Sequence, residues 1–361
     1  MTHALSRSNG LLAVNYLYRY NVSAFSAFFH LLSMRAAAAL ARTPPVRALN
    51  GSIDLANECD RAFDVGAAAV DKLLWNDEKG YFRSYTGGDA LMADALYAQA
   101  RRSDASEHIH ARSHAELRTQ SYAQISAECA PRAPPAQVLA DTLGLGPLGA
   151  DAKTHDGRVL SHLHAVAAQN DSPYGLLAQT GRYGPTSNSA DNAVWMMGPP
   201  NWASLALRRG LEPPTALAVA RKALDWWRVG LRDTWNIAAL VGGVGYGADG
   251  LPHANSHYGY HLVAWHILFA LSGQSYDAPT RALAFAPVLP APYALPVLVP
   301  NTAAQLRARA DGAYELRVLA GAPLVLDALC VRGSAPRPGE LPRTLAPGQS
   351  VAWGGPAVVV E

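Results

Sequence analysis

One short stretch of the chain combines residue types that can open a glycosidic bond. It runs from Asp191 to Leu207, DNAVWMMGPPNWASLAL, and holds one carboxylate, two tryptophans, two methionines and a Gly-Pro-Pro break. Pyranose rings stack on indole faces, and glycosidases use carboxyl groups as acid, base or nucleophile. Apolar neighbours help a general acid to keep its proton near neutral pH. The stretch therefore indicates a carbohydrate site with Asp191 as the catalytic general acid/base.

Each of these residues also has a purely structural interpretation. Asp191 is suited to cap the helix that follows it, and tryptophans are more often core residues than sugar platforms. Trp195 and Trp202 are thus either substrate-binding or core residues. Trp226 and Trp227 are adjacent and face different directions, which favours core packing for both.

Further candidates for substrate binding lie on either side of this stretch. Asp94 stands among apolar neighbours, where a buried carboxylate needs partners, and it is a candidate to support the site. His257, Tyr258 and His261 are candidates to donate hydrogen bonds to sugar hydroxyls. We expect no metal site and no cofactor, because no carboxylate accompanies the histidines of that run and no Gly-rich phosphate loop follows a strand.

Composition narrows the class of protein. The chain has 361 residues, half of them hydrophobic, with a net charge of +2 and three cysteines. A charge this close to zero gives no field for nucleic acid or an acidic membrane, and three distant cysteines predict no disulfide framework. The N-terminus resembles no signal peptide, so we expect a cytoplasmic protein. The apolar segment 22–42 is interrupted by His30 and Arg35 and predicts a buried helix rather than an integral membrane segment.

The apolar spacing predicts paired helices along the first three quarters of the chain. Further helices are expected over 53–75, from Asp89 onward, over 157–169, over 193–209, from Pro213, and over 253–272. YFRSY predicts a short strand, and 171–190 predicts a long loop. The segment 100–137 is polar and interrupts a helical pattern, so it is either a disordered surface loop or translated non-coding sequence. A metal site at His108, His110 and His114 is not expected there.

After residue 276 the pattern changes to short alternating runs separated by turn residues. The expected organisation is therefore a helical domain over 1–276 and a small antiparallel β domain over 277–361. Helical hairpins with site residues in their connections indicate a mainly α fold, a partial (α/α)6 toroid. A plain helical bundle has much the same periodicity and remains an alternative.

Four blocks of the sequence resemble the catalytic region of glycoside hydrolase family 116, which includes β-glucosidases and the non-lysosomal glucosylceramidase. LLWNDEKGYFRSY (73–85) is similar to "LLWNG-x-YYNY" of the family, and ALMADALYAQ (90–99) to "VMSDQ-x-AGQW", with Asp94 and Gln99 in corresponding positions. LADTLGLG (139–146) is similar to "LxKACGLG", and DNAVWMMGPP (191–200) to the "SDEVWxG" block with the acid/base aspartate. The resemblance implies retaining hydrolysis of β-glucosides or related glycosides by an α/α toroid.

The chain departs from the family pattern in three places. The family aspartate stands three residues before the tryptophan, where this chain has Asn192. NSHYGYHLVAW (255–265) replaces a block with an arginine, so the resemblance implies sugar contacts from His257, Tyr258 or His261 instead. The family nucleophile, a glutamate, precedes the helix matched to 22–42, but residues 1–21 contain no Asp or Glu. We expect a chain that lacks its N-terminal part and does not hydrolyse an aryl β-glucoside alone.

Three hypotheses follow from the sequence. The first is a glycosidase that acts on a carbohydrate or glycoside. The second is a carbohydrate-binding pseudoenzyme that lacks the nucleophile. The third is a non-functional fragment, for which exposed apolar faces predict an insoluble product. The sugar, the aglycone and the oligomeric state are left open.

Overall fold

The computed structural model describes the chain in segments: 22–93, 95–96, 145, 148–180, 193–233, 235–242, 250–256, 259–278, 280–336, 341 and 344–354. The described residues form two compact units, here called the N-terminal unit and the β unit, which divide between His266 and Ile267. The sequence places this division after residue 276. Each unit is described separately below.

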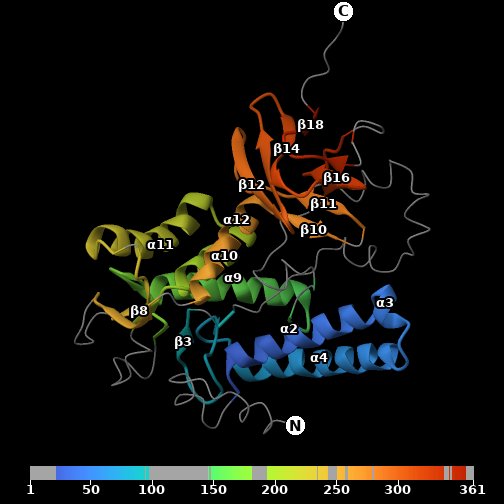
Figure 1. The fold of residues 1–361 in the computed structure, drawn as a ribbon. Coiled ribbons are helices and arrows are strands. Elements are labelled where there is room, and N and C mark those ends of the chain that lie inside the picture. Colours follow the sequence, from blue (N-terminus) through green and yellow to red (C-terminus); the bar gives the residue numbers. More distant parts are fainter. Residues whose placement is uncertain are drawn as a thin grey trace, which may run out of the picture. The chain divides into compact units, whose positions relative to one another are not determined.

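The N-terminal unit begins with a helical hairpin. Helices α2 (Ala24–Ala41) and α4 (Ser52–Leu74) lie side by side, with the short α3 (Pro44–Arg47) between them (Figure 1). Two prolines at the start of α3 prevent α2 from continuing, because a proline residue interrupts a helix. In α4, buried residues recur every three or four positions: Ala56, Cys59, Phe63, Ala67, Val70 and Leu74. The predicted helices over 22–42 and 53–75 are confirmed.

Helix α2 is also the one described helix that is long and apolar enough to cross a membrane, with a mean hydropathy of 1.4 over 18 residues. Part of its surface is buried: Phe28 and Leu31 are fully enclosed, and Ala38 and Ala41 pack on α4 residues Ala56 and Cys59. A core helix passes the same length and hydropathy test as a membrane helix. The prediction of a buried helix is consistent with this packing.

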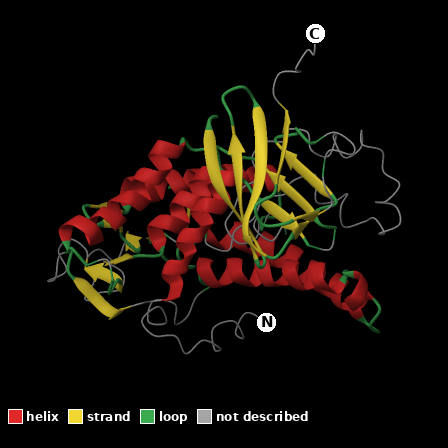
Figure 2. Cartoon of the chain, turned by 45° about the horizontal axis from the view of Figure 1, so that its top comes forward, coloured by secondary structure: helices red, strands yellow, loops and turns green. Residues whose placement is uncertain are grey.

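Short strands alternate with the remaining helices of the N-terminal unit (Figure 2). The hairpin β1 (Trp75–Asn76) with β2 (Tyr81–Phe82) follows α4, and β3 (Leu91–Met92) pairs with β6 (Gln179–Thr180). Helix α9 (Ala152–Gln169) leads into the hairpin β4 (Asp171–Ser172) with β5 (Gly175–Leu176). The short strand expected at YFRSY is thus confirmed as β2. The helix expected from Asp89 is wrong where the chain is described, because β3 occupies its start.

The last part of this unit contains a three-stranded antiparallel sheet and a second helical hairpin. Strand β8 (Ala238–Gly242) is central between β7 (Ala193–Trp195) and β9 (Pro252–Ser256). Helices α10 (Gly198–Arg208) and α11 (Pro213–Asp225) each begin with prolines in their first turn, where the missing N–H costs nothing. A π-helical turn η1 (Trp226–Gly230) continues α11.

Two of the predicted helices are only partly correct. The helix expected over 193–209 starts at Gly198, because residues 193–195 pair as β7. The helix expected over 253–272 is shorter: β9 and the 3-10 helix η2 (Gly259–Ala264) precede α12 (Trp265–Ser272). The loop expected over 171–190 contains β4, β5 and β6 within its described part.

The β unit contains a four-stranded antiparallel sheet in the order β12-β13-β14-β18. Its strands are β12 (Tyr293–Val299), β13 (Thr302–Ala308), β14 (Ala313–Gly321) and β18 (Ser350–Gly354). A second sheet has the order β10 (Ser275–Asp277), β11 (Ala282–Phe285) and β16 (Ala328–Val331), and β15 (Leu324–Val325) pairs with β17 (Thr344–Leu345). Alternate residues of these strands enclose one core that includes Phe285, Val297, Leu306, Leu316, Val318, Val331 and Trp353.

The observed architecture corrects the expected fold class. The described residues include seven α-helices and eighteen strands, and nine of these strands lie within the N-terminal unit. This interleaving is incompatible with a mainly α toroid of helical hairpins. The β unit also differs from a purely antiparallel domain, because β11 and β16 pair in parallel. The chain is therefore a mixed α and β protein.

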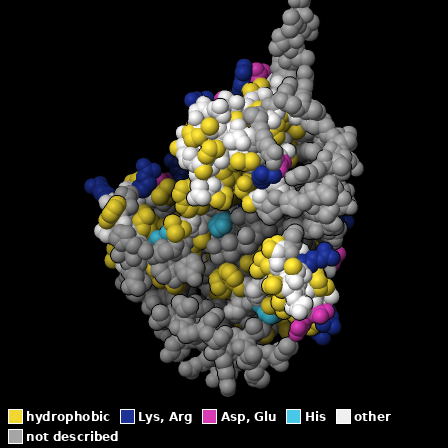
Figure 3. Space-filling model, turned by 45° about the vertical axis from the view of Figure 1, so that its right-hand side comes forward, with side chains coloured by type: hydrophobic (Ala, Val, Ile, Leu, Met, Phe, Trp, Pro, Cys, Tyr) yellow, Lys and Arg dark blue, Asp and Glu magenta, His cyan; other side chains and the backbone are white. Residues whose placement is uncertain are grey.

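Figure 3 shows the side chains on one face of the molecule. On the face in Figure 3, described basic and acidic side chains form small separate groups among hydrophobic and uncharged ones. Large hydrophobic side chains are exposed in both units, for example Val65 on α4 and Leu319 on β14. The distribution on this face agrees with the small net charge of the sequence.

Candidate functional site

Two segments that each contain a candidate carboxylate meet at one residue, Ala178. The backbone N–H of Ala93 donates to the carbonyl of Ala178 over 3.0 Å, and the N–H of Ala178 donates to the carbonyl of Ala193 over 2.7 Å. Ala93 directly precedes Asp94, and Ala193 follows Asp191 by two positions. The fold therefore brings together, through one peptide bridge, two segments that are about a hundred residues apart in the sequence. We call this the Ala178 bridge.

The buried side chain of Asn170 holds the Ala178 bridge in place. Asn170 caps the C-terminal end of α9, and its amide nitrogen donates to the carbonyls of Leu91 (3.2 Å) and Leu177 (2.9 Å). Its amide oxygen accepts from the Thr180 hydroxyl over 3.0 Å. Buried amide groups need such partners, since an unsatisfied carbonyl in the interior is costly. One side chain thus fixes the strand before Asp94 against the hairpin that leads to Ala178.

His162 of α9 contacts the backbone of β2 and of β3. Its Nδ1 accepts a hydrogen bond from the backbone N–H of Phe82 over 3.3 Å, and the side chain is buried. Burial lowers the pKa of His162 to about 3, although an interaction with the backbone of Met92 partly opposes this effect. The imidazole is therefore neutral at pH 7, which is the state that can accept the Phe82 hydrogen bond.

The three-stranded sheet positions Trp195 near His261. Trp195 lies opposite Leu240 in the register of β7 and β8, and the next residue, Met196, donates its N–H to the carbonyl of Ala239 over 3.2 Å. Burial lowers the pKa of His261, and a hydrogen bond to the backbone of Ala239 opposes that shift. The chain around Trp195 and the His261 side chain therefore converge on Ala239. Trp195 is partly exposed and so retains surface for a ligand.

The aromatic cluster beneath the sheet is structural. Trp227 is buried and directs its indole N–H to the sulfur of Met196, 2.7 Å away. Trp226 packs on Tyr174 with ring centres 4.6 Å apart and donates to the carbonyl of Gly250 over 2.7 Å. Gly250 has a positive φ, and a Cβ there would lie 2.5 Å from the Trp226 ring. The prediction of core packing is confirmed for Trp227, whereas Trp226 is partly buried and packs against the same cluster.

Trp202 also belongs to the core. It is only 2% exposed, and its indole N–H donates to the carbonyl of Leu163 in α9 over 3.0 Å. An indole enclosed on both faces has no surface on which a pyranose can stack. The sugar-binding role considered for Trp202 is therefore replaced by its structural alternative, a tryptophan that packs α10 on α9.

The other predicted site residues lie outside the described residues. These are Asp94, Asp191, His257 and Tyr258. The register of the sheet nevertheless shows that the residue after the Asp191 segment, Ala193, and the residue before His257, Ser256, lie far apart along β8. Ala193 begins β7 opposite Gly242, whereas Ser256 ends β9 opposite Ala238. The chain thus enters β7 and leaves β9 at opposite ends of β8. Segment 100–137, with the three histidines considered above, also lies outside the described residues.

Sequence reasoning missed a buried cationic group at the end of α10. Arg208 is buried, and together with burial of the imidazole it lowers the pKa of His266 to about 4. The neighbouring Arg209 forms an ion pair with Asp156 of α9 at 3.4 Å. Asn170 and His162 were missed as well, because a single polar residue in an amphipathic helix pattern gives no sign of its tertiary partner. The available signal was the position of Asn170 at the predicted helix end.

Within the segments that the structure describes, no group of three or more His, Cys, Asp or Glu side chains is arranged to hold a metal ion. Comparison of the chain with known protein families gives no match, and no curated protein is significantly similar to it. The arrangement that remains is a pair of acid-bearing segments joined at Ala178, beside a partly exposed tryptophan and a histidine.

Proposed function

We propose that this protein is a glycoside hydrolase-like protein that acts on β-glucosides or related glycosides with retention of configuration. Asp191 is the general acid/base, and Asp94, Trp195 and His261 line the substrate site. His257 and Tyr258 follow β9 at the other end of β8, so we assign them to a more distant part of the substrate. The observation that best supports this proposal is the Ala178 bridge, because it links the backbone next to Asp94 with the backbone next to Asp191. The resemblance of blocks 90–99 and 191–200 to family 116 supports the same pairing of segments.

The chemistry assigns a defined task to Asp191. In retaining glycosidases the acid protonates the glycosidic oxygen as the bond breaks, and a second carboxylate about 5 to 5.5 Å away attacks the sugar. The same acid group then acts as a base and activates water. The sequence offers no carboxylate among residues 1–21, where the family places its nucleophile. The proposal therefore assigns the acid/base role alone.

The dependence of hydrolysis on the leaving group tests this role. Dinitrophenolate leaves without protonation, whereas phenolate needs a proton from the acid. In a preparation that turns over aryl β-glucosides, which we do not expect of this chain alone, Asp191→Asn should reduce kcat/KM for phenyl β-glucoside about 10² to 10⁴-fold and that for 2,4-dinitrophenyl β-glucoside much less. Asp171→Asn is the matched control, because Asp171 is an exposed carboxylate paired with Lys222.

A carbohydrate-binding pseudoenzyme is the second candidate, and Asn192 favours it. This residue occupies the position of the family acid/base aspartate, three residues before Trp195. Saturable binding of a β-glucoside without turnover of either aryl glycoside supports the pseudoenzyme. Turnover with the stated leaving-group dependence supports the hydrolase. A soluble chain with neither binding nor turnover contradicts both candidates.

A further inference from the structure

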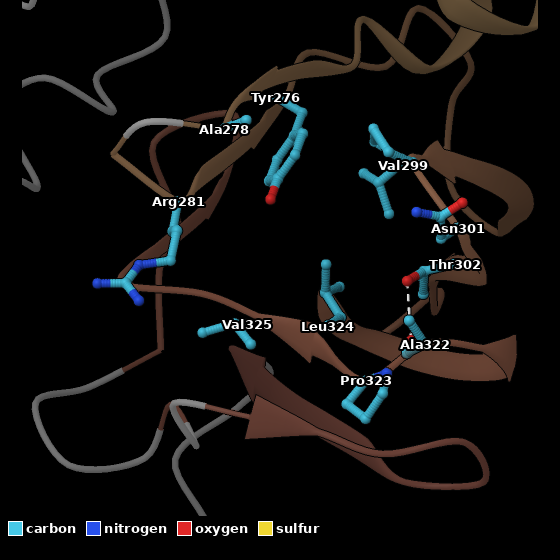
Figure 4. A pocket seen from close by; sticks show the side chains of 11 residues that line it. Tyr276, Ala278, Arg281, Val299, Asn301, Thr302, Ala322, Pro323, Leu324 and Val325 are labelled. Carbon is cyan, nitrogen blue, oxygen red and sulfur yellow. Dashed lines mark hydrogen bonds between the residues drawn. The ribbon is translucent and has the colours of Figure 1, made fainter. Parts of the chain in front are cut away.

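The β unit contains a cavity of about 320 Å³ that is separate from the candidate glycosidase site (Figure 4). Tyr276 comes from β10, Val299 ends β12, and Leu324 and Val325 form β15. Asn301 lies in the turn between β12 and β13. Cavities that bind small molecules start at about 300 Å³ and combine apolar walls with a few polar groups. This cavity fits the lower end of that range.

Two uncharged polar side chains are available in the cavity. Figure 4 shows the Tyr276 hydroxyl directed into the space between Val299, Leu324 and Val325. Within the described segments, neither this hydroxyl nor the Asn301 amide forms a hydrogen bond. The nearby Thr302 hydroxyl, in contrast, donates to the carbonyl of Ala322 over 2.8 Å. Tyr276 and Asn301 are therefore the groups that a bound molecule would meet.

Among the described residues that line the cavity, Arg281 is the charged one, and it is paired with Asp327. The Arg281 guanidinium donates through Nε to a carboxylate oxygen of Asp327 over 2.8 Å, and the Arg281 carbonyl accepts from the Asp327 N–H over 3.0 Å. Its side chain extends away from the cavity in Figure 4. An anionic ligand would have to compete with the Asp327 carboxylate. The cavity thus favours an uncharged ligand over a carboxylate or phosphate.

The backbone on two sides of the cavity adopts an uncommon conformation. Arg281 has φ of 53° and Asn301 has φ of 61°, in the left-handed region that few non-glycine residues occupy. Asparagine tolerates this region better than most residues, and such conformations cluster at ligand sites. At Asn301 the left-handed turn gives the amide its place at the cavity edge. Glycine is the residue that can remove this side chain without changing the turn.

We propose that this cavity binds a neutral pyranose unit. Pro323 and Val325, which keep exposed surface at the cavity, pack against the apolar face of the ring, and Tyr276 and Asn301 hydrogen-bond to its hydroxyls. The proposal goes beyond the glycosidase activity and does not rest on it. A second sugar-binding position on the same chain would hold a glycan or glycoside during turnover elsewhere.

Binding of methyl β-D-glucopyranoside to the full chain tests the proposal, with methyl β-D-glucuronide as the charged counterpart. By ligand-observed NMR titration we expect the neutral sugar to bind with a Kd of about 1 mM and the glucuronide to bind more weakly. Tyr276→Phe and Asn301→Gly should each raise the Kd about fivefold, the effect of one neutral hydrogen bond. Tyr314→Phe removes a hydroxyl from β14, away from the cavity, and should leave the Kd unchanged.

The outcomes separate this proposal from the proposed function. An unchanged Kd in both cavity variants, tighter binding of the glucuronide, or no binding of the neutral sugar to the full chain overturns the pyranose site. Asp191→Asn is expected to leave the binding that is sensitive to Tyr276 intact. Conversely, loss of turnover in Asp191→Asn with no effect of the cavity variants on binding would retain the hydrolase and refute the cavity proposal.

Discussion

The two units of this chain are stabilised in different ways. In the β unit, β13 and β14 run for seven and nine residues, and the central part of each alternates buried and exposed side chains. In the N-terminal unit, the strands near the site are two to five residues long, and polar side chains such as Asn170 and His162 join them to α9. The β unit is joined by repeated apolar contacts along long strands, whereas the short strands near the site in the N-terminal unit are joined to α9 by specific hydrogen bonds as well as by apolar packing.

This difference shows where single substitutions have their effects. A regular sheet distributes its stability over many equivalent residues, so the effect of a change depends on which face the residue occupies. A unit joined by individual polar contacts concentrates its stability in the groups that make them, because a broken contact leaves a buried partner unsatisfied. The predictions below test this contrast.

The largest expected effect is in the β unit. Leu316 is fully buried on β14 and pairs with Leu306 and Val351. Leu316→Ala should reduce the free energy of unfolding by about 3 kcal/mol, through lost burial and the cavity that remains. Hydrogen exchange of β13 and β14 peptides measures this loss. Leu319→Ala on the same strand is the control, because Leu319 is 50% exposed and should change little. Equal effects of the two variants would contradict the assigned faces.

A slightly smaller effect is expected for Asn170 in the N-terminal unit. Asn170→Ala deprives the Leu91 and Leu177 carbonyls of a buried donor and should cost about 2.5 kcal/mol. Exchange protection should fall in peptides that contain β3 and β6, while peptides from β13 keep theirs. Asn50→Ala, in an exposed turn, is the control. Unchanged protection of β3 in Asn170→Ala would show that the Ala178 bridge does not depend on this amide.

Acid should weaken the N-terminal unit selectively. His162 has a pKa of about 3 when folded, below its ordinary value of 6.5, so the unfolded chain binds more protons between these pH values. The contribution of His162 to the free energy of unfolding is complete above pH 6.5. It is lost as the pH falls toward 3, and about 2 kcal/mol is lost by pH 5. His266 acts in the same direction, with a folded pKa of about 4.

Residues 267–361 contain no histidine, so β13 and β14 provide an internal reference in this experiment. Hydrogen exchange at pH 5 and pH 7, corrected for the intrinsic exchange rates, should show the loss in peptides of the N-terminal unit, including α9 and β2, and none in β13 and β14. His162→Gln should reduce the pH dependence of the N-terminal unit, with the part due to His266 remaining. A pH dependence that is equal in both units, or that the variant leaves unchanged, would refute the role of His162.

The smallest effects are expected from surface ion pairs in either unit. Lys79 pairs with Asp89 at 2.8 Å in the N-terminal unit, and Arg309 pairs with Asp311 at 2.9 Å in the β unit. These side chains are largely solvated, so Lys79→Gln and Arg309→Gln should each leave the denaturation midpoint almost unchanged. Denaturant titration at low and high salt measures this. A clearly lowered midpoint that persists in high salt would mean that the pair is less exposed to water than its geometry indicates.

The contrast between the units also explains which elements could be predicted from the sequence. Apolar periodicity located α2, α4 and the strands of the β unit, because each buries one regular face. It failed at β3, β7 and β9, where two to five residues pair inside segments with helical spacing. Such strands are defined by backbone partners far away in the chain, as Leu91 is by Thr180. These missed strands account for the incorrect toroid.

The candidate site also contains residues that the sequence could identify and residues that it could not. The tryptophans could be recognised from the sequence as either core or binding residues, but only the structure assigns Trp202 to the core. Asn170 could not be identified, because its three side-chain partners come from segments before and after it in the chain. The role of Ala178 gives no sequence signal at all, since it acts through its peptide groups.

A bridge made of peptide groups has a consequence for the evolution of this chain. Natural selection acts on the identity of a side chain, yet Ala178 joins Ala93 and Ala193 by atoms that every residue except proline possesses in full. A change of side chain therefore leaves the bonding atoms in place, provided that the new side chain fits around the buried Ala93 and Ala193. Descendants of a common ancestor can keep this bridge after their sequences have diverged beyond recognition at these positions.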